Sequence, residues 1–224
     1  MIRSLLAVLM FAFVLPAKAE EGRVQVISLL GKKPQVFSAE PGFPGRYRWL
    51  EEEIGNFGID EKLADSVARA LASAGKPAIP VLYEFDRDAL YAKRSRWFNH
   101  GYDKNALAAL VLGLQKEGVA PPFLLLVQHR IPVVGAMGDK TSYGYGLMRN
   151  PRQTMAFVSV RALFFCEPER VCAQDGHWEY MEVPGFVTSR PLADPSVAEL
   201  EAASTVLDAA IPRFSDELVR KLRL

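Results

Sequence analysis

The sequence predicts an α+β fold: a single domain with a mixed, mostly antiparallel sheet, helices packed mainly on one face, and a C-terminal helix. Three observations predict it. Strand-like and helix-like segments alternate through the first half of the chain. Short strand-like segments joined by turn residues fill the second half, before a last helix. Half of the 224 residues are apolar and 24% are charged, as is typical of a folded domain.

The first 19 residues are interpreted as a signal peptide. Arg3 supplies a positive charge, Leu5 to Leu15 is an uninterrupted apolar run, and Ala17-Lys18-Ala19 has the small-x-small pattern that signal peptidase accepts. A helix of that run would be about 16 Å long, which is too short for a ~30 Å bilayer core. We therefore expect export, to the periplasm in a bacterium, with cleavage after Ala19. The mature domain would span residues 20–224, without a transmembrane anchor.

The first elements of the mature chain follow local patterns. Arg23 to Leu30 alternates as a strand does, and Gln35 to Ser38 follows turn residues, so that it is expected to pair back as a hairpin. Asp60 is expected to cap a helix whose apolar residues recur every three to four positions up to Gly75. Ala78 to Phe85 is apolar and β-favouring, which predicts a buried strand.

Two further helices and a central strand are predicted in the middle of the chain. Asp86 is placed to cap a helix that reaches about Phe98, and Asp103 is placed to cap the next one. Pro122 to Val134 is the most apolar segment of the mature chain. We expect it to be the central strand.

Shorter strands and a helix complete the prediction. Four segments are expected as strands joined by turns: Tyr143–Met148, Met155–Phe165, Trp178–Val183 and Gly185–Thr188. Pro195 opens a helix that continues to about Ala210. Pro212 is expected to interrupt it, leaving a short helical tail from about residue 212 whose removal after Arg213 would be tolerated.

The Gly-Tyr-Gly-Leu stretch from Gly144 to Leu147, together with this layout, resembles uncharacterised exported proteins of Gram-negative bacteria. The resemblance implies export, in agreement with the N-terminal segment. It carries no catalytic motif, so no functional residue is transferred by it.

The two cysteines, Cys166 and Cys172, are six residues apart in a chain expected to be exported. Oxidising compartments favour a bridge between them, across a tight loop that contains Pro168. Because the spacing is not Cys-x-x-Cys, a redox catalyst is not predicted. We predict a structural disulfide, with two reduced thiols as the alternative.

Catalytic signatures are weak. Ser142 lacks the first glycine of a Gly-x-Ser-x-Gly elbow, and the nearby His129 and Asp139 would form a triad with it only if the fold brought them together. The three histidines lack the spacing of a zinc protease, so neither a metal nor a cofactor is expected. The sequence favours a non-catalytic envelope accessory or binding protein. The alternative is an exported hydrolase of an ester or cell-wall substrate that uses these three residues.

Two clusters combine cations with aromatic rings, and their candidate binding residues are Arg46, Arg48, Trp49, Arg94, Arg96 and Trp97. Without the signal peptide the chain has 25 basic and 26 acidic side chains, so nucleic acid is not an expected partner. Arginine binds phosphate or carboxylate groups, and rings add stacking area. We expect an anionic envelope component or an acidic protein as partner. The alternative is that the cations face solvent and the rings face the core.

Overall fold

The computed structural model describes residues 22–32, 34–39, 47–51, 57–92, 102–131, 142–149, 152–186 and 194–224. The predicted signal peptide lies outside these residues. The strands are β1 (Val24–Ser28), β2 (Gln35–Ala39), β3 (Tyr47–Glu51), β4 (Ala78–Pro80), β5 (Phe123–Gln128), β6 (Arg130–Ile131), β7 (Ser142–Arg149), β8 (Thr154–Glu167) and β9 (Arg170–Glu182). The helices are α1 (Ile59–Ser73), α2 (Arg87–Tyr91), α3 (Lys104–Lys116) and α4 (Val197–Leu222). Within the described ranges, no helix is both long and apolar enough to cross a membrane.

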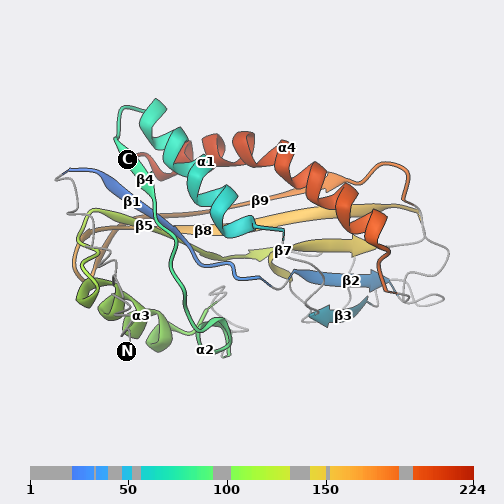
Figure 1. Cartoon of the computed structure of the whole chain (residues 1–224), viewed down its shortest axis with the longest axis horizontal. Coiled ribbons are helices and arrows are strands. Elements are labelled where there is room, and N and C mark those ends of the chain that lie inside the picture. The colour runs from blue at the N-terminus through green and yellow to red at the C-terminus, as the bar shows by residue number, and fades with distance from the viewer. Residues whose placement is uncertain are drawn as a thin grey trace, which may run out of the picture.

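The sheet is organised around the long antiparallel hairpin of β8 and β9 (Figure 1). Since β9 occupies one edge of β8, the other edge pairs with β7 along Thr154–Ser159 and with β5 along Val160–Phe165. The strands β7 and β5 therefore lie end to end, and each begins one half of the sheet. One half has the order β7-β2-β3 and the other β5-β1-β4. Five of the eight pairings among the described strands are antiparallel, which confirms the mixed, mostly antiparallel sheet.

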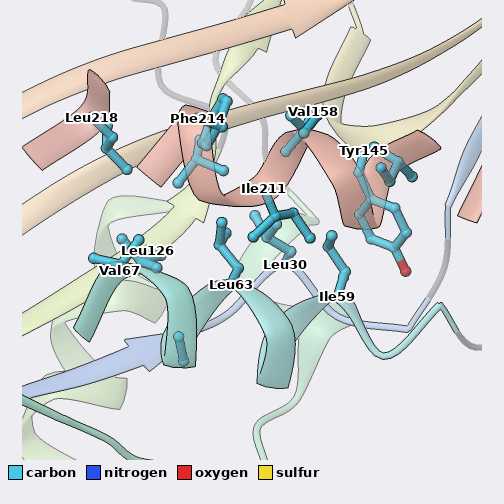
Figure 2. Packing of buried hydrophobic residues seen from close by; sticks show 14 of the residues in the cluster. Leu30, Ile59, Leu63, Val67, Leu126, Tyr145, Val158, Ile211, Phe214 and Leu218 are labelled. Carbon is cyan, nitrogen blue, oxygen red and sulfur yellow. The ribbon is translucent and has the colours of Figure 1, made fainter. Parts of the chain in front are cut away.

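The two longest helices, α1 and α4, lie together on one face of the sheet, and the shorter α2 and α3 lie on the other (Figure 1). This confirms the C-terminal helix that packs on the sheet, whereas the helices cover both faces, with the two longest on one of them. Figure 2 shows part of the main core, to which Leu63 of α1, Ile211 of α4 and Leu126 of β5 all contribute. All three side chains are buried, so the apolar stripe of each helix covers the sheet.

The predicted β1–β2 hairpin is wrong. The neighbours of β1 are β4 and β5, both parallel to it, whereas β2 pairs with β3 and β7. The turn residues after β1 end the strand but do not turn the chain back to pair with it. Gly31 adopts φ +81°, which favours glycine, and a Cβ at this position would lie 3.0 Å from Cγ of Arg87. The predicted strand from Ala78 to Phe85 is also shorter, because β4 ends at Pro80.

The predicted interruption of the last helix at Pro212 is also wrong. The single helix α4 runs through Pro212 to Leu222, and Phe214, Leu218 and Leu222 beyond the proline are buried in the main core. Proline in a helix interior costs about 3 kcal/mol. Burial of these side chains outweighs that cost. Pro212 has no N–H to donate to the carbonyl four residues earlier, but because Pro212 is exposed, water can bond that carbonyl instead.

Cys166 and Cys172 are joined as a disulfide at the tip of the β8–β9 hairpin, with their Cα atoms 5.9 Å apart. The predicted bridge is therefore present, and it closes the end of the longest hairpin in the described sheet.

Thiol labelling of the denatured, non-reduced protein should detect no free thiol. Reduction should lower the free energy of unfolding by roughly 2–2.5 kcal/mol, as expected for so short a loop. Two labelled thiols before reduction would contradict the bridge.

Candidate functional site

After β1 ends, the chain passes between the two halves of the sheet. The backbone carbonyls there are hydrogen-bonded by buried side chains. The carbonyl of Leu29 accepts from the Tyr91 hydroxyl (2.5 Å), and that of Leu30 from the Gln128 amide nitrogen (2.8 Å). The carbonyl of Gly31 accepts from the Tyr145 hydroxyl (3.0 Å). Because a buried carbonyl without a donor is costly, these side chains fix the path of the chain as it leaves β1.

Asp60 binds the same segment through its backbone N–H groups. Its carboxylate accepts from the Ser28 hydroxyl at 2.6 Å and from the backbone N–H groups of Leu30 and Gly31 at 2.8 Å each. The residue at the start of α1 is instead Gly58, which makes no side-chain cap. The predicted capping role of Asp60 is thus wrong, since its side chain is used to hold the end of β1.

Burial raises the pKa of Asp60, although the hydrogen bonds from Ser28, Leu30 and Gly31 and the nearby charge of Arg87 act in the opposite direction. The side chain of Arg87 is only 11% exposed and lies against Gly31, with its guanidinium carbon 5.8 Å from the centre of the Tyr91 ring. A carboxyl group and a guanidinium are therefore held close together, at the carboxyl end of a central parallel strand.

These residues form one wall of a cleft of about 440 Å³, which we call the β1–β4 cleft. Its other wall is the segment that follows β4, where rings and charges alternate. The cleft is lined by Gly31, Lys32, Asp60, Tyr83, Glu84, Phe85, Asp86, Arg87 and Asp88. Open α/β sheets bind ligands at the carboxyl ends of parallel strands, and the volume lies within the usual range for ligand sites.

Asp60→Asn should lower the free energy of unfolding by about 1–3 kcal/mol. The amide has only one acceptor oxygen, so one of the two backbone N–H groups that Asp60 binds loses its partner. Urea unfolding measures the change. Asp65→Asn is the matched control on the same helix, since its carboxylate is 53% exposed and pairs only with Arg69 among the described residues. We expect less than about 0.5 kcal/mol there. Equal losses in the two variants would show that Asp60 does not hold the end of β1.

The structure brings few of the sequence-predicted site residues together. Ser142 is the first residue of β7, and its backbone lies opposite Ile131 of β6. Arg48 and Trp49 lie in β3, opposite Ser38 and Phe37, and only their backbone is described. Five of the predicted site residues lie outside the described residues: Arg46, Arg94, Arg96, Trp97 and Asp139.

His129 is the one catalytic candidate whose side chain is described. Its ring packs against β9, where a Cβ at Gly176 would lie 2.6 Å from it. Its Nδ1 is buried without a hydrogen-bond partner in the described structure. Burial, together with the charge of Arg161, lowers the pKa of His129 to about 4, so the imidazole is neutral at pH 7 and a weak base. This arrangement fits a packed side chain better than a general base.

The pKa of His129 makes stability depend on pH. The unfolded chain protonates this histidine near pH 6.5 and the folded chain only near pH 4, so the unfolded state binds the extra proton between these values. Stability should therefore fall as the pH drops through this window. Urea midpoints near pH 7 and pH 4.5 should differ less in His129→Gln than in the unmodified protein. An unchanged difference would contradict the assignment. His177→Gln should also narrow the difference, because burial lowers the pKa of His177 too.

Metal binding finds no support in the described part of the chain, which contains no group of three or more His, Cys, Asp or Glu side chains that could hold an ion. Comparison with known proteins adds no assignment: no protein-family model matches the chain, and no curated protein matches it. The site must therefore be interpreted from its own geometry.

Sequence reasoning missed the residues that build the β1–β4 cleft. Asp60 has an ordinary position for a helix cap, and nothing in its neighbourhood in sequence indicates that it contacts Ser28 and Gly31, about thirty residues earlier. Arg87 falls in the helix that Asp86 was predicted to cap, where an exposed charge is ordinary. The one available signal was the apolar run of β1 ending at a glycine, which is typical of a sharp change in backbone direction.

Proposed function

We propose that this chain is an exported, non-catalytic envelope protein that binds a small polar ligand in the β1–β4 cleft. The observation that carries the proposal is the position and lining of this cleft. It lies at the carboxyl ends of β1 and β4, and the buried Asp60 network makes its inner wall rigid before any ligand binds. A preformed wall reduces the ordering cost of binding.

The lining supports a ligand that carries charges of both signs. Lys32 and Arg87 are cationic, while Glu84 and Asp88 are anionic. The rings of Tyr83 and Phe85 add apolar surface. Asp60 is held by three hydrogen bonds, which suits a supporting residue. No Ser, Thr, Cys or His is among the described residues that line the cleft, so this site offers no ordinary nucleophile–base pair.

The binding test uses the mature protein and soluble disaccharide-peptide fragments of peptidoglycan, which carry both amines and carboxylates. We expect binding by titration calorimetry, weakened about three- to ten-fold by Lys32→Gln or Glu84→Gln, as for loss of one partly exposed charged contact. Arg69→Gln, an exposed change on α1 outside the cleft lining, is the control and should bind normally. Equal binding by all variants would remove the cleft as the site.

The alternative function remains an exported hydrolase of an ester or cell-wall polymer, with Ser142, His129 and Asp139 as its candidates. The packed, weakly basic imidazole of His129 favours binding over this alternative. Turnover of an ester panel or of purified peptidoglycan by the mature protein, abolished by Ser142→Ala, would reverse the preference.

The basic and aromatic clusters are proposed to contact an anionic envelope component or an acidic protein. Co-sedimentation with envelope fragments should weaken in the double variant Arg94→Ala/Arg96→Ala. It should also weaken with added salt, because exposed charges are screened within ~8 Å at physiological ionic strength. Unchanged co-sedimentation would identify the cations as a solvated surface.

A further inference from the structure

A second cavity lies between α3 and the tip of the β8–β9 hairpin, away from the β1–β4 cleft. This groove, which we call the α3–hairpin groove, has a volume of about 640 Å³. Its floor is apolar and consists of Leu107 and Val111 of α3 and Phe165 of β8. Leu112 stands on its rim with 46% of its surface exposed, which is high for a leucine beside an apolar floor.

The groove is braced at the hairpin end. The Cys166–Cys172 disulfide directly follows Phe165 and fixes the strand ends that form this wall. The side chain of Gln115, near the end of α3, donates to the carbonyl oxygen of Pro168 in the hairpin turn. Because helix and hairpin are tied together in this way, the cavity is formed without a ligand.

The two ends of the groove differ in charge. Lys104, the first residue of α3, is at one end. Tyr102 also lines the groove, and its hydroxyl is hydrogen-bonded by Arg161. Glu169 is in the hairpin turn, next to the carbonyl that Gln115 binds, and is therefore near the other end of the helix.

The Lys104 end suits an anion better than the Glu169 end suits a cation. Lys104 lines the former end, Arg161 bonds Tyr102 beside it, and the helix N-terminus adds partial positive charge there. Asp103 offsets part of this charge, but its carboxylate already accepts from the N–H groups of Asn105 and Ala106. From Lys104 to Leu112 the helix rises about 12 Å, which is close to the length of an extended ten-carbon chain.

We propose that the α3–hairpin groove binds an acyl chain with an anionic head, its head beside Lys104 and its tail along Leu107, Val111 and Leu112. The acyl chain covers the apolar floor and the exposed side chain of Leu112, and the anionic head lies beside Lys104. A free fatty acid and a single-chain anionic lipid share this chemistry.

The test is titration calorimetry of the mature, disulfide-bonded protein with decanoate, kept below its micelle concentration. Decyltrimethylammonium has the same chain and the opposite charge, and we expect it to bind about ten-fold more weakly than decanoate, as charge complementarity at one head group would give. Decanoyl lysophosphatidylglycerol separates the sources, because tighter binding than decanoate would indicate a lipid head group and weaker binding a free acid.

Lys104→Glu should reverse the preference between the two head groups, and Leu112→Asn should weaken both probes. Lys116→Glu makes the same charge change on the same helix, in its last turn and outside the groove, and should leave both affinities unchanged. Absence of decanoate binding, a preference for the cationic probe, or equal losses in Lys104→Glu and Lys116→Glu would each overturn the proposal. Lys104→Gln, a milder change, should give a smaller loss of decanoate affinity in the same direction.

Discussion

Glu199→Gln should lower the free energy of unfolding by about 3–5 kcal/mol, the usual cost of removing one partner from a buried ion pair. Glu199, in the first turn of α4, accepts from Nε of Arg149 at 2.8 Å and from the Thr154 hydroxyl at 3.1 Å. Its side chain is 5% exposed and that of Arg149 is 3% exposed. The variant removes the carboxylate charge that pairs with the buried guanidinium of Arg149. The free-energy cost of burying that guanidinium is then no longer offset by an ion pair. Urea unfolding measures the loss.

Two further variants determine whether the charge is the cause. Arg149→Met/Glu199→Leu removes both ions and should recover much of the stability lost by Glu199→Gln, since apolar pairs of similar size commonly replace buried ion pairs without loss. Lys62→Met breaks the exposed pair with Asp208 (2.7 Å) and should cost at most about 1 kcal/mol. A loss in Glu199→Gln no larger than that in Lys62→Met would contradict the prediction.

Deletion of residues 214–224 should unfold the protein. It removes Phe214, Leu218, Val219 and Leu222, which are all buried against α1 and the sheet. Burial of each such side chain contributes about 1.5–3 kcal/mol. Their sum is comparable with the whole stability of a typical domain, about 5–15 kcal/mol. Far-ultraviolet circular dichroism and a thermal melt of the truncated protein provide the measurement.

Point variants separate the lost core from the lost charges of the tail. Phe214→Ala alone should cost about 3–5 kcal/mol, because it leaves a cavity between α4 and the sheet. Arg220→Ala is the control: its side chain is 72% exposed and pairs with Glu217, so the expected loss is below about 1 kcal/mol. A cooperative melt of the truncated protein close to that of the full chain would restore the interpretation of residues after 213 as a dispensable tail.

Periodic segments were predicted correctly because their signals are local. The apolar spacing of Leu63, Val67 and Leu71 indicated α1, and all three residues are buried on the face that it presents to the core. Asp103 was predicted to cap α3, and its side chain accepts from two backbone N–H groups in the first turn. Cys166 and Cys172 needed only their spacing and the expected compartment.

The candidate site could not be predicted in the same way, because its contacts join distant segments. Asp60 meets Ser28, Arg87 lies against Gly31, and Tyr145 reaches Gly31 across more than a hundred residues. Nothing in the local pattern of any of these residues differs from that of an ordinary cap, charge or core ring. These residues come together only in the fold, where the chain that follows β1 passes between the two halves of the sheet.

Local patterns were enough to predict the class of the fold, the order of most elements and the disulfide, since periodicity, turn residues and cysteine spacing act over a few neighbouring positions. Contacts between distant segments place β1 and β2 in different halves of the sheet, carry α4 through Pro212 and make Asp60 hold the end of β1. In each case a preference of the local chain is opposed by burial or by a hydrogen bond between distant segments. Apolar side chains packed against the whole sheet outweigh the roughly 3 kcal/mol cost of a proline, and buried backbone groups require donors and acceptors wherever the fold can supply them.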